Sequence, residues 1–305
     1  MWNRLPTILG RRGALLIALT AMPLLAQQKV DIHRAARSNV SVRLSGAVAS
    51  VRVAAWPHDS IAITGLIGAG SRLEGGPLNF TGPVSGMKLY VEATSDAALA
   101  GNKLEIRVPR EASVWIKLGS ADVDVAGVAG GLDLNIIGGS VAVSGKPREL
   151  IVESMDGAVR FTGYADYARV KTATGNITVT NGGGEDLSFT TVSGSIHASN
   201  GAREIARARF ESVTGPITFA GALGRGTDLR FDTHSGAVEV RLPLGTPASV
   251  DAVTMTGGIE NVWSGTRPNP GREGRGMELS SSSRTAVARI SIRSFKGNLR
   301  LAAMN

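Results

Sequence analysis

The chain has 305 residues, of which 39 are glycine and none is cysteine, and its formal net charge is +8. It is long enough to bury a sizeable core. The lack of cysteine excludes disulfides, thiolate metal sites and a lipid-modified N-terminal cysteine. No basic stretch is interleaved with aromatic residues, which argues against a nucleic acid partner.

Residues 1–26 have the layout of a signal peptide. Three arginines precede the apolar run 14–25, which is too short to span a bilayer. Ala26 offers a small residue for cleavage, and an uncleaved anchor is the alternative. We therefore expect an exported protein, periplasmic, cell-surface or extracellular, with no membrane span after cleavage. Its remaining 30 basic and 25 acidic residues give a formal charge of +5.

Residues 27–115 are predicted to form irregular first turns and a cap at one end of a coil. Alternating apolar residues predict strands at 40–46, 51–56, 61–63, 88–92 and 103–108. The segment 65–86 is rich in glycine, proline and serine, which predicts a loop. No break in composition calls for a separate domain.

The region 116–305 contains glycines at nearly even intervals of 18 to 21 residues, with one final step of 40 that we take as two ordinary steps. These glycines are Gly119, Gly139, Gly157, Gly175, Gly194, Gly215, Gly236, Gly257 and Gly297. A period near 20 residues is typical of a solenoid, in which one supersecondary unit winds on top of the next.

Other residues repeat with the same period as the glycines. A serine or threonine stands three residues before most of them, at Ser154, Thr172, Thr191, Ser212, Thr233, Thr254 and Ser294. An apolar residue follows two residues after the glycine, at Val141, Val159, Ile177, Ile196, Ile217, Val238, Ile259 and Leu299. A second alternating strand precedes each hydroxyl residue. Each turn, here called a rung, is therefore two short strands joined by a corner at the glycine.

The predicted fold is all-β: a single-stranded parallel β-solenoid, β-helix-like, with rungs of about 20 residues. Sequential coiling places each strand parallel to its counterpart one turn away, and nine rungs span on the order of 40 Å. An antiparallel sandwich of hairpins is the alternative. Glycine suits the corners because it tolerates positive φ, and the hydroxyl groups are expected to bond to the corner backbone or to the next rung.

A loop insertion at 264–276 interrupts the glycine column. It contains Arg267, Arg272 and Arg275 together with two prolines, and a mobile surface loop is favoured over a binding loop. Residues 27–305 are expected to form one continuous domain.

Two pairs of acidic residues are the strongest candidates for catalysis. Glu239 and Glu260 share the outward position three after the glycine, and Glu211 and Asp232 share the outward position before the hydroxyl column. Glycoside hydrolysis needs two nearby carboxylates. An arginine two residues before each member of the second pair instead favours a solvated charge lattice.

The remaining titratable residues show no metal-ligand or nucleophile spacing. They are His33, His58, His197 and His234, with the scattered outward acids Asp122, Asp124 and Asp133. The sequence therefore predicts no catalytic, cofactor-binding or metal-ligating residue, and no cofactor.

Several segments resemble a known family. Residues 104–109 (Leu-Glu-Ile-Arg-Val-Pro), the rungs at 190–196 and 232–238, and the strand that ends at Trp56 resemble the bacterial putative-adhesin family of unknown function. The resemblance covers most of residues 38–301. It implies an exported β-solenoid and brings no catalytic residues with it.

Three functions are compatible with these patterns. The favoured one is a non-catalytic adhesin or cell-envelope scaffold that binds a surface glycan or another envelope component over a flat face. The second is a carbohydrate-active enzyme of the β-helix type, a lyase or hydrolase. The third is an accessory or sensor protein of an envelope-stress system. Oligomeric state is not indicated.

Overall fold

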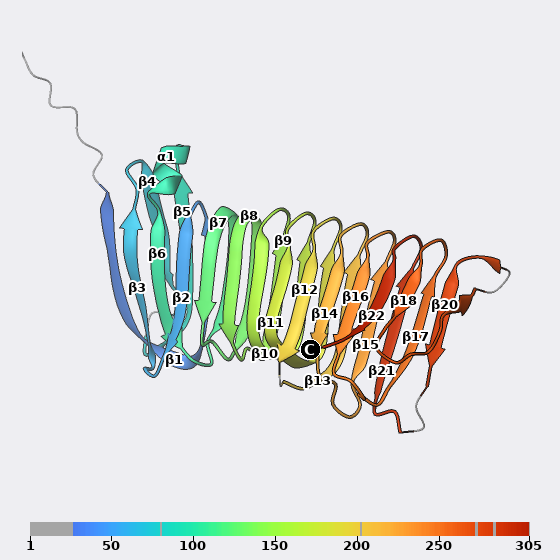
Figure 1. The fold of residues 1–305 in the computed structure, drawn as a ribbon. Helices are drawn as coiled ribbons and strands as arrows, with labels where there is room; N and C mark the ends of the chain where they lie inside the picture. The colour runs from blue at the N-terminus through green and yellow to red at the C-terminus, as the bar shows by residue number, and fades with distance from the viewer. Residues whose placement is uncertain (1–26, 80, 202, 272–273, 283–284, 305) are drawn as a thin grey trace, which may run out of the picture.

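The computed structural model describes residues 27–304, except 80, 202, 272–273 and 283–284. These residues form 22 strands, stacked side by side along one axis, and one five-residue helix (Figure 1). Most strand pairs are parallel, which confirms an all-β, solenoid-like architecture and rules out the sandwich of hairpins. The predicted signal peptide, 1–26, and Arg272 lie outside the described residues.

The middle of the stack is a regular series of parallel rungs. Its strands are β7 (Ser113–Ala126), β8 (Gly131–Gly145), β9 (Glu149–Ser154), β10 (Ala158–Thr172), β11 (Ile177–Thr191), β12 (Ile196–Gly201), β13 (Ile205–Ser212), β14 (Ile217–Gly221), β15 (Asp228–Thr233) and β16 (Val238–Leu242). Val159 pairs with Ile177, and Ile177 pairs with Ile196. Equivalent residues of successive repeats are therefore neighbours, as the column pattern predicts.

Each rung contributes one extended segment to each of two layers that enclose the core. A single long strand, such as β10, can supply a segment to both layers. The front layer consists of the segments before the hydroxyl column, and the back layer consists of the segments after the glycine column. Phe189, Phe210 and Phe231 stack along the front layer, with ring centroids 5.5 and 5.0 Å apart. Phe219 of the back layer packs against Phe210 at 5.9 Å. Side chains of both layers thus meet in one continuous apolar core.

The hydroxyl column bonds in both of the expected ways. The Thr172 hydroxyl donates to the carbonyl of Gly175 at 2.6 Å and lies 3.0 Å from the hydroxyl of Thr191 on the next rung. Thr191 in turn accepts from the amide of Gly194 at 3.1 Å. These buried hydroxyls satisfy corner backbone groups that would otherwise lack partners.

The glycine column is required for a different reason from the one predicted. Of its nine members only Gly139 has a positive φ, +95°. At Gly194 an added Cβ would collide with the carbonyl oxygen of Gly175, and at Gly215 with that of Gly194. Close approach of stacked backbones, and not a left-handed conformation, therefore excludes side chains at these corners.

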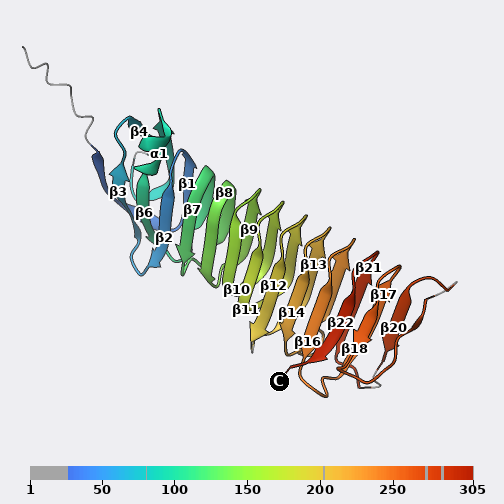
Figure 2. The same ribbon diagram turned by 45° about the horizontal axis from the view of Figure 1, so that its top comes forward.

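The C-terminal rungs do not follow chain order. They comprise β17 (Ala248–Thr254), β18 (Ile259–Asn261), β19 (Asn269–Pro270), β20 (Met277–Ser281), β21 (Ala288–Ser294) and β22 (Leu299–Ala303). Strand β21 pairs with both β15 and β17, and β22 pairs with both β16 and β18. The last rung is therefore inserted between two earlier ones (Figure 2). The prediction of strictly sequential coiling is wrong here, and β20 covers β17 in antiparallel fashion.

The N-terminal rungs are interleaved in the same way. They comprise β1 (Gln28–Gly46), β2 (Ser50–Trp56), β3 (Ser60–Ile67), β4 (Ser71–Pro77), β5 (Val84–Ala93), α1 (Asp96–Ala100) and β6 (Lys103–Pro109). The second half of β1 lies between β5 and β7, and β2 lies between β6 and β7, all in parallel.

Antiparallel strands cover this end of the stack. Strand β3 pairs with β1 and β6, and β4 pairs with β5. The segment predicted as a loop, 65–86, therefore contains a strand, β4. Similarly, the predicted loop 264–276 contains β19, which pairs with β20. None of the described residues forms a helix long and apolar enough to cross a bilayer.

Candidate binding groove

The first pair of predicted acidic residues is not a pair in the structure. Arg300 of the inserted strand β22 lies between Glu239 and Glu260, with nitrogen–oxygen distances of 3.5 and 3.4 Å. The hypothesis that these carboxylates stack directly is wrong, because the spacing in sequence gives no sign of the inserted rung. Arg300 thus pairs with both carboxylates, and Arg241 also pairs with Glu239 at 3.0 Å.

The second pair does stack, inside the predicted charge lattice. Glu211 is directly beside Asp232. Arg209 lies 2.8 Å from Glu211 and 3.7 Å from Asp232, and Arg230 lies 2.6 Å from Asp232. Both carboxylates are thus neutralised by cations on the same surface.

The histidines do not come together. His33 lies 3.0 Å from the nearby Asp31, and His234 stacks on the ring of Phe295 at 5.1 Å. Within the described ranges there is no group of three or more histidine, aspartate or glutamate side chains suited to hold a metal ion.

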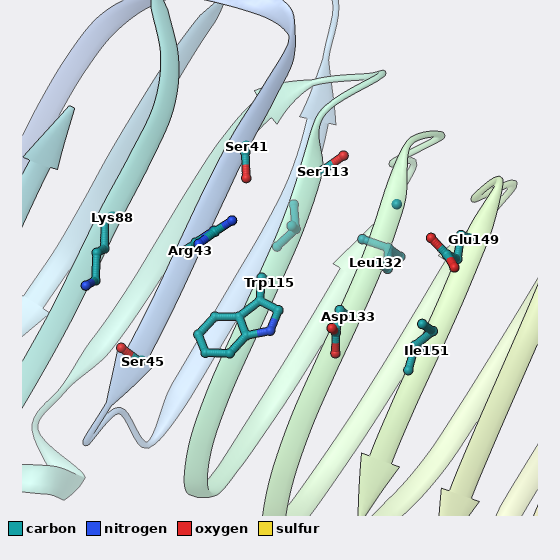
Figure 3. Close-up of a pocket in the computed structure, with 12 residues that line it drawn as sticks. Ser41, Arg43, Ser45, Lys88, Ser113, Trp115, Leu132, Asp133, Glu149 and Ile151 are labelled. Atoms are coloured by element: carbon teal, nitrogen blue, oxygen red, sulfur yellow. The ribbon is translucent and has the colours of Figure 1, made fainter. Parts of the chain in front are cut away.

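A groove of about 620 Å³ lies on the outer surface of the front layer, near the N-terminal rungs (Figure 3). We call it the Trp115 groove. Its charged and aromatic lining residues are Arg43, Lys88, Trp115, Asp133 and Glu149. Ser41, Ser45, Ser113 and Gly131 also line it, and their small side chains leave open space around the indole ring.

Strand alternation places Trp115 in the groove. Its neighbours Val114 and Ile116 are buried in the core, so the pleat turns the indole outward, where it is half-buried. Among the described residues the indole N–H of Trp115 has no hydrogen-bond partner. By contrast, the indoles of Trp56 and Trp263 donate to backbone carbonyls at 2.8 and 3.1 Å.

The charges in the groove are sorted by sign. Lys88, Arg43, Trp115 and Asp133 occupy successive strands in one register row. The two cations lie on one side of the ring, and Asp133 and Glu149 lie on the other (Figure 3). None of these four charged groups forms an ion pair within the part of the chain that the structure describes. Partial burial, followed by repulsion from Glu153 and Glu149, raises the pKa of Asp133.

Sequence reasoning missed most of this site. Asp133 was noted only as a scattered outward acid, and Trp115 was not singled out. The available signal was an aromatic residue at the outward phase of an alternating strand, between two inward apolar residues. The cations come from β1 and β5, whose position beside β7 depends on the interleaved N-terminal rungs.

A second feature is a mostly apolar ridge along one corner of the stack, at the position two residues before each glycine of the column except Gly119, where Lys117 stands instead. Its members are Ile137, Met155, Ala173, Val192, Val213, His234, Phe295 and Met255. The side chains are mostly exposed, Ile137 by 58% and Met155 by 57%. Backbone bonds between adjacent rungs, such as Val192 to Ala173 at 3.1 Å, hold them in line. This column is visible in the sequence but was not recognised.

Comparison with proteins of known sequence and structure gives limited information on activity. No curated protein matches this sequence. One solved structure that aligns is a protein from Clostridium sporogenes described as a "putative cell adhesion protein". It shares 7% sequence identity, with 92% of this chain and 99% of that chain covered, and a TM-score of 0.26. A likeness that low carries no argument about function.

The family comparison is decisive for classification. The model of the family described as Toastrack DUF4097 matches residues 73–242, which is more than half of the chain. The match runs from β4 to the end of β16 and so contains the regular rungs and most of the groove. It confirms the resemblance to a family of unknown function that the rung motif indicates. This chain belongs to the Toastrack DUF4097 family.

Proposed function

We propose that this protein is an exported, non-catalytic, adhesin-like component of the cell envelope that binds a surface glycan through the Trp115 groove. The observation that carries the proposal is the half-buried indole of Trp115, which lines the groove among hydroxyl and charged groups. Aromatic rings supply large apolar contact area with a polar edge. Such a ring suits the C–H face of a sugar, while the polar neighbours suit its hydroxyl groups.

The stacked architecture supports binding of an extended polymer. Successive rungs lie about 4.8 Å apart and are held by continuous backbone ladders, so the groove changes shape little on binding. A flat repetitive face binds through area and a few anchor residues.

One observation favours a second candidate, a polysaccharide hydrolase. Asp133 and Glu149 line the same groove, and the raised pKa of Asp133 is the property expected of a general acid. We favour binding alone because Glu149 is exposed and Asp133 is only half-buried, so the described residues do not enclose the two carboxylates away from water.

The test of binding is a glycan array combined with polysaccharides extracted from bacterial envelopes, probed with the purified protein. We expect at least one glycan to bind and Trp115→Ala to weaken that binding about tenfold or more. Phe295→Ala, which removes an aromatic side chain that is 46% exposed outside the groove, is the matched control and should bind normally. Binding that is unaffected by Trp115→Ala would refute the assignment of the site.

The hydrolase alternative is decided with the same ligands. The bound polysaccharide is incubated with the protein and analysed for new reducing ends. We expect none. Cleavage that disappears in both Asp133→Asn and Glu149→Gln would replace the binding proposal with the enzymatic one.

A further inference from the structure

We propose that the ligand of the Trp115 groove is a zwitterionic glycan, one that carries an acidic group and a free amine on neighbouring sugars. This inference rests on the proposed function and specifies its ligand. It follows from the charge arrangement in the groove, where cations and carboxylates are sorted by sign on either side of Trp115, unlike the paired charges around Glu211 and Asp232 on the same layer.

At one other place on the front layer, opposite charges compensate one another. In the C-terminal half, Arg209 and Arg230 contact Glu211 and Asp232 at 2.6 to 3.7 Å. In the groove the same kinds of side chain are left without protein partners among the described residues. Charges that are sorted by sign and have no protein partner can form ion pairs with a ligand whose own charges are arranged in the complementary order.

The register sets the spacing that a ligand must match. Arg43, Trp115 and Asp133 are on three adjacent strands, so the backbones that carry the two charges are about 10 Å apart. This distance is comparable to a disaccharide. A sugar that stacks on Trp115 would direct its own amine toward Asp133 and Glu149. The acidic group of the neighbouring sugar would then point toward Arg43 and Lys88.

The same pattern disfavours ligands of a single charge. A purely anionic polymer that crosses the groove meets Asp133 and Glu149, and a purely cationic polymer meets Arg43 and Lys88. Like-charge contacts of this kind select against the wrong ligand. A neutral glycan would partly desolvate all four charges without pairing any of them. An amine would also relieve the repulsion that Asp133 experiences from Glu153 and Glu149.

The experiment compares polysaccharides that differ only in charge. Hyaluronan carries acids and acetylated amines, its partially de-N-acetylated form adds free amines to the same backbone, and chitosan oligosaccharides carry amines alone. Isothermal titration with the wild-type protein should show the de-N-acetylated hyaluronan binding about tenfold or more tightly than either of the others at equal length. Raising the salt concentration should reduce this preference.

Charge-removing variants test each half of the groove. Asp133→Asn should abolish the preference for de-N-acetylated hyaluronan over hyaluronan, and Arg43→Gln should abolish its preference over chitosan. Asp251→Asn on a distant part of the front layer and Arg160→Gln on the back layer are matched controls that should keep both preferences. Melting curves establish that each variant is folded.

The outcomes separate this inference from the proposed function. Equal affinity for hyaluronan and its de-N-acetylated form, with both abolished by Trp115→Ala, would overturn the zwitterion assignment and leave glycan binding intact. If no glycan shows binding that depends on Trp115, the zwitterion assignment and the proposed function are both overturned. Phosphatidylethanolamine vesicles carry the two charges without sugar, and binding to these vesicles alone would overturn the assignment of a glycan.

Discussion

At the scale of single residues, the sequence predicts the positions of the glycine column correctly, but the physical reason for glycine at these positions differs from the predicted one. The spacing identifies the corners, but the reason for glycine is the carbonyl oxygen of the preceding rung. At Gly194 and Gly215 that oxygen occupies the position a Cβ would need. Both backbones at the contact are fixed by strand ladders, so neither yields easily.

This difference in cause gives a testable prediction. Gly194→Ala should lower the free energy of unfolding by about 1–3 kcal/mol through overpacking, although its φ is not in the left-handed region. Gly119→Ala is the matched control from the same column, because no atom lies within 4 Å of the position of its Cβ. Urea denaturation measures both. Equal stability of the two variants would contradict the close-approach explanation.

At the scale of elements, the N-terminal cap depends on one buried amide. Asn102 is fully buried. Its Nδ2 donates to the carbonyl of Ala47 at 2.8 Å and to the hydroxyl of Ser71 at 2.9 Å, and its Oδ1 accepts from the amide of Gly68 at 2.7 Å. One side chain therefore joins the β1–β2 turn to both ends of the β3–β4 turn.

Removal of this amide should weaken the cap specifically. We expect Asn102→Ala to cost about 2–4 kcal/mol, because buried backbone groups at Gly68 and Ala47 lose their partner. Asn135→Ala, which removes an exposed amide bonded only to Glu153 at 3.3 Å, should cost little. Denaturation gives the energies, and hydrogen exchange should show faster exchange in β3 and β4 than in the central rungs. Uniform exchange throughout the stack would argue against a local role.

Sequence reasoning succeeds for elements whose periodicity repeats and fails where pairing depends on distant partners. The central strands follow from alternation around equivalent residues such as Val159 and Ile177. Strand β4 was missed because its sequence, Ser-Arg-Leu-Glu-Gly-Gly-Pro, has turn composition and becomes a strand by pairing with β5. The groove was missed for the same reason, since the cations beside Trp115 come from strands whose neighbours the repeat pattern does not specify.

At the scale of the whole molecule, the two ends of the stack share one topological rule. The first and the last rungs of the chain each lie one place in from the outermost parallel rung, with parallel partners on both sides. Spacing alone does not distinguish this order from a sequential one, because 40 residues separate Gly257 from Gly297 in either case.

The absence of native cysteine allows a direct test of rung order. Paired strands bring Cα atoms to about 5 Å, within the range of a disulfide, whereas strands two places apart are near 10 Å. Glu239→Cys combined with Arg300→Cys should therefore cross-link rapidly under mild oxidation. Glu239→Cys combined with Glu260→Cys should remain reduced. The reverse result, read by gel mobility under non-reducing conditions, would restore the sequential order.

The inserted C-terminal rung also constrains how the chain reaches its native state. Strands β17 and β18 are synthesised before β21 and β22, yet they acquire their parallel neighbours only when those last strands arrive. Pairing that proceeds strictly in chain order cannot complete this region, because residues 288–303 occupy the positions between β15 and β17 and between β16 and β18. In a chain shortened before β21, strand β17 would keep only its antiparallel partner β20, and β18 would lose its partner β22, so the parallel stack would end at β15 and β16.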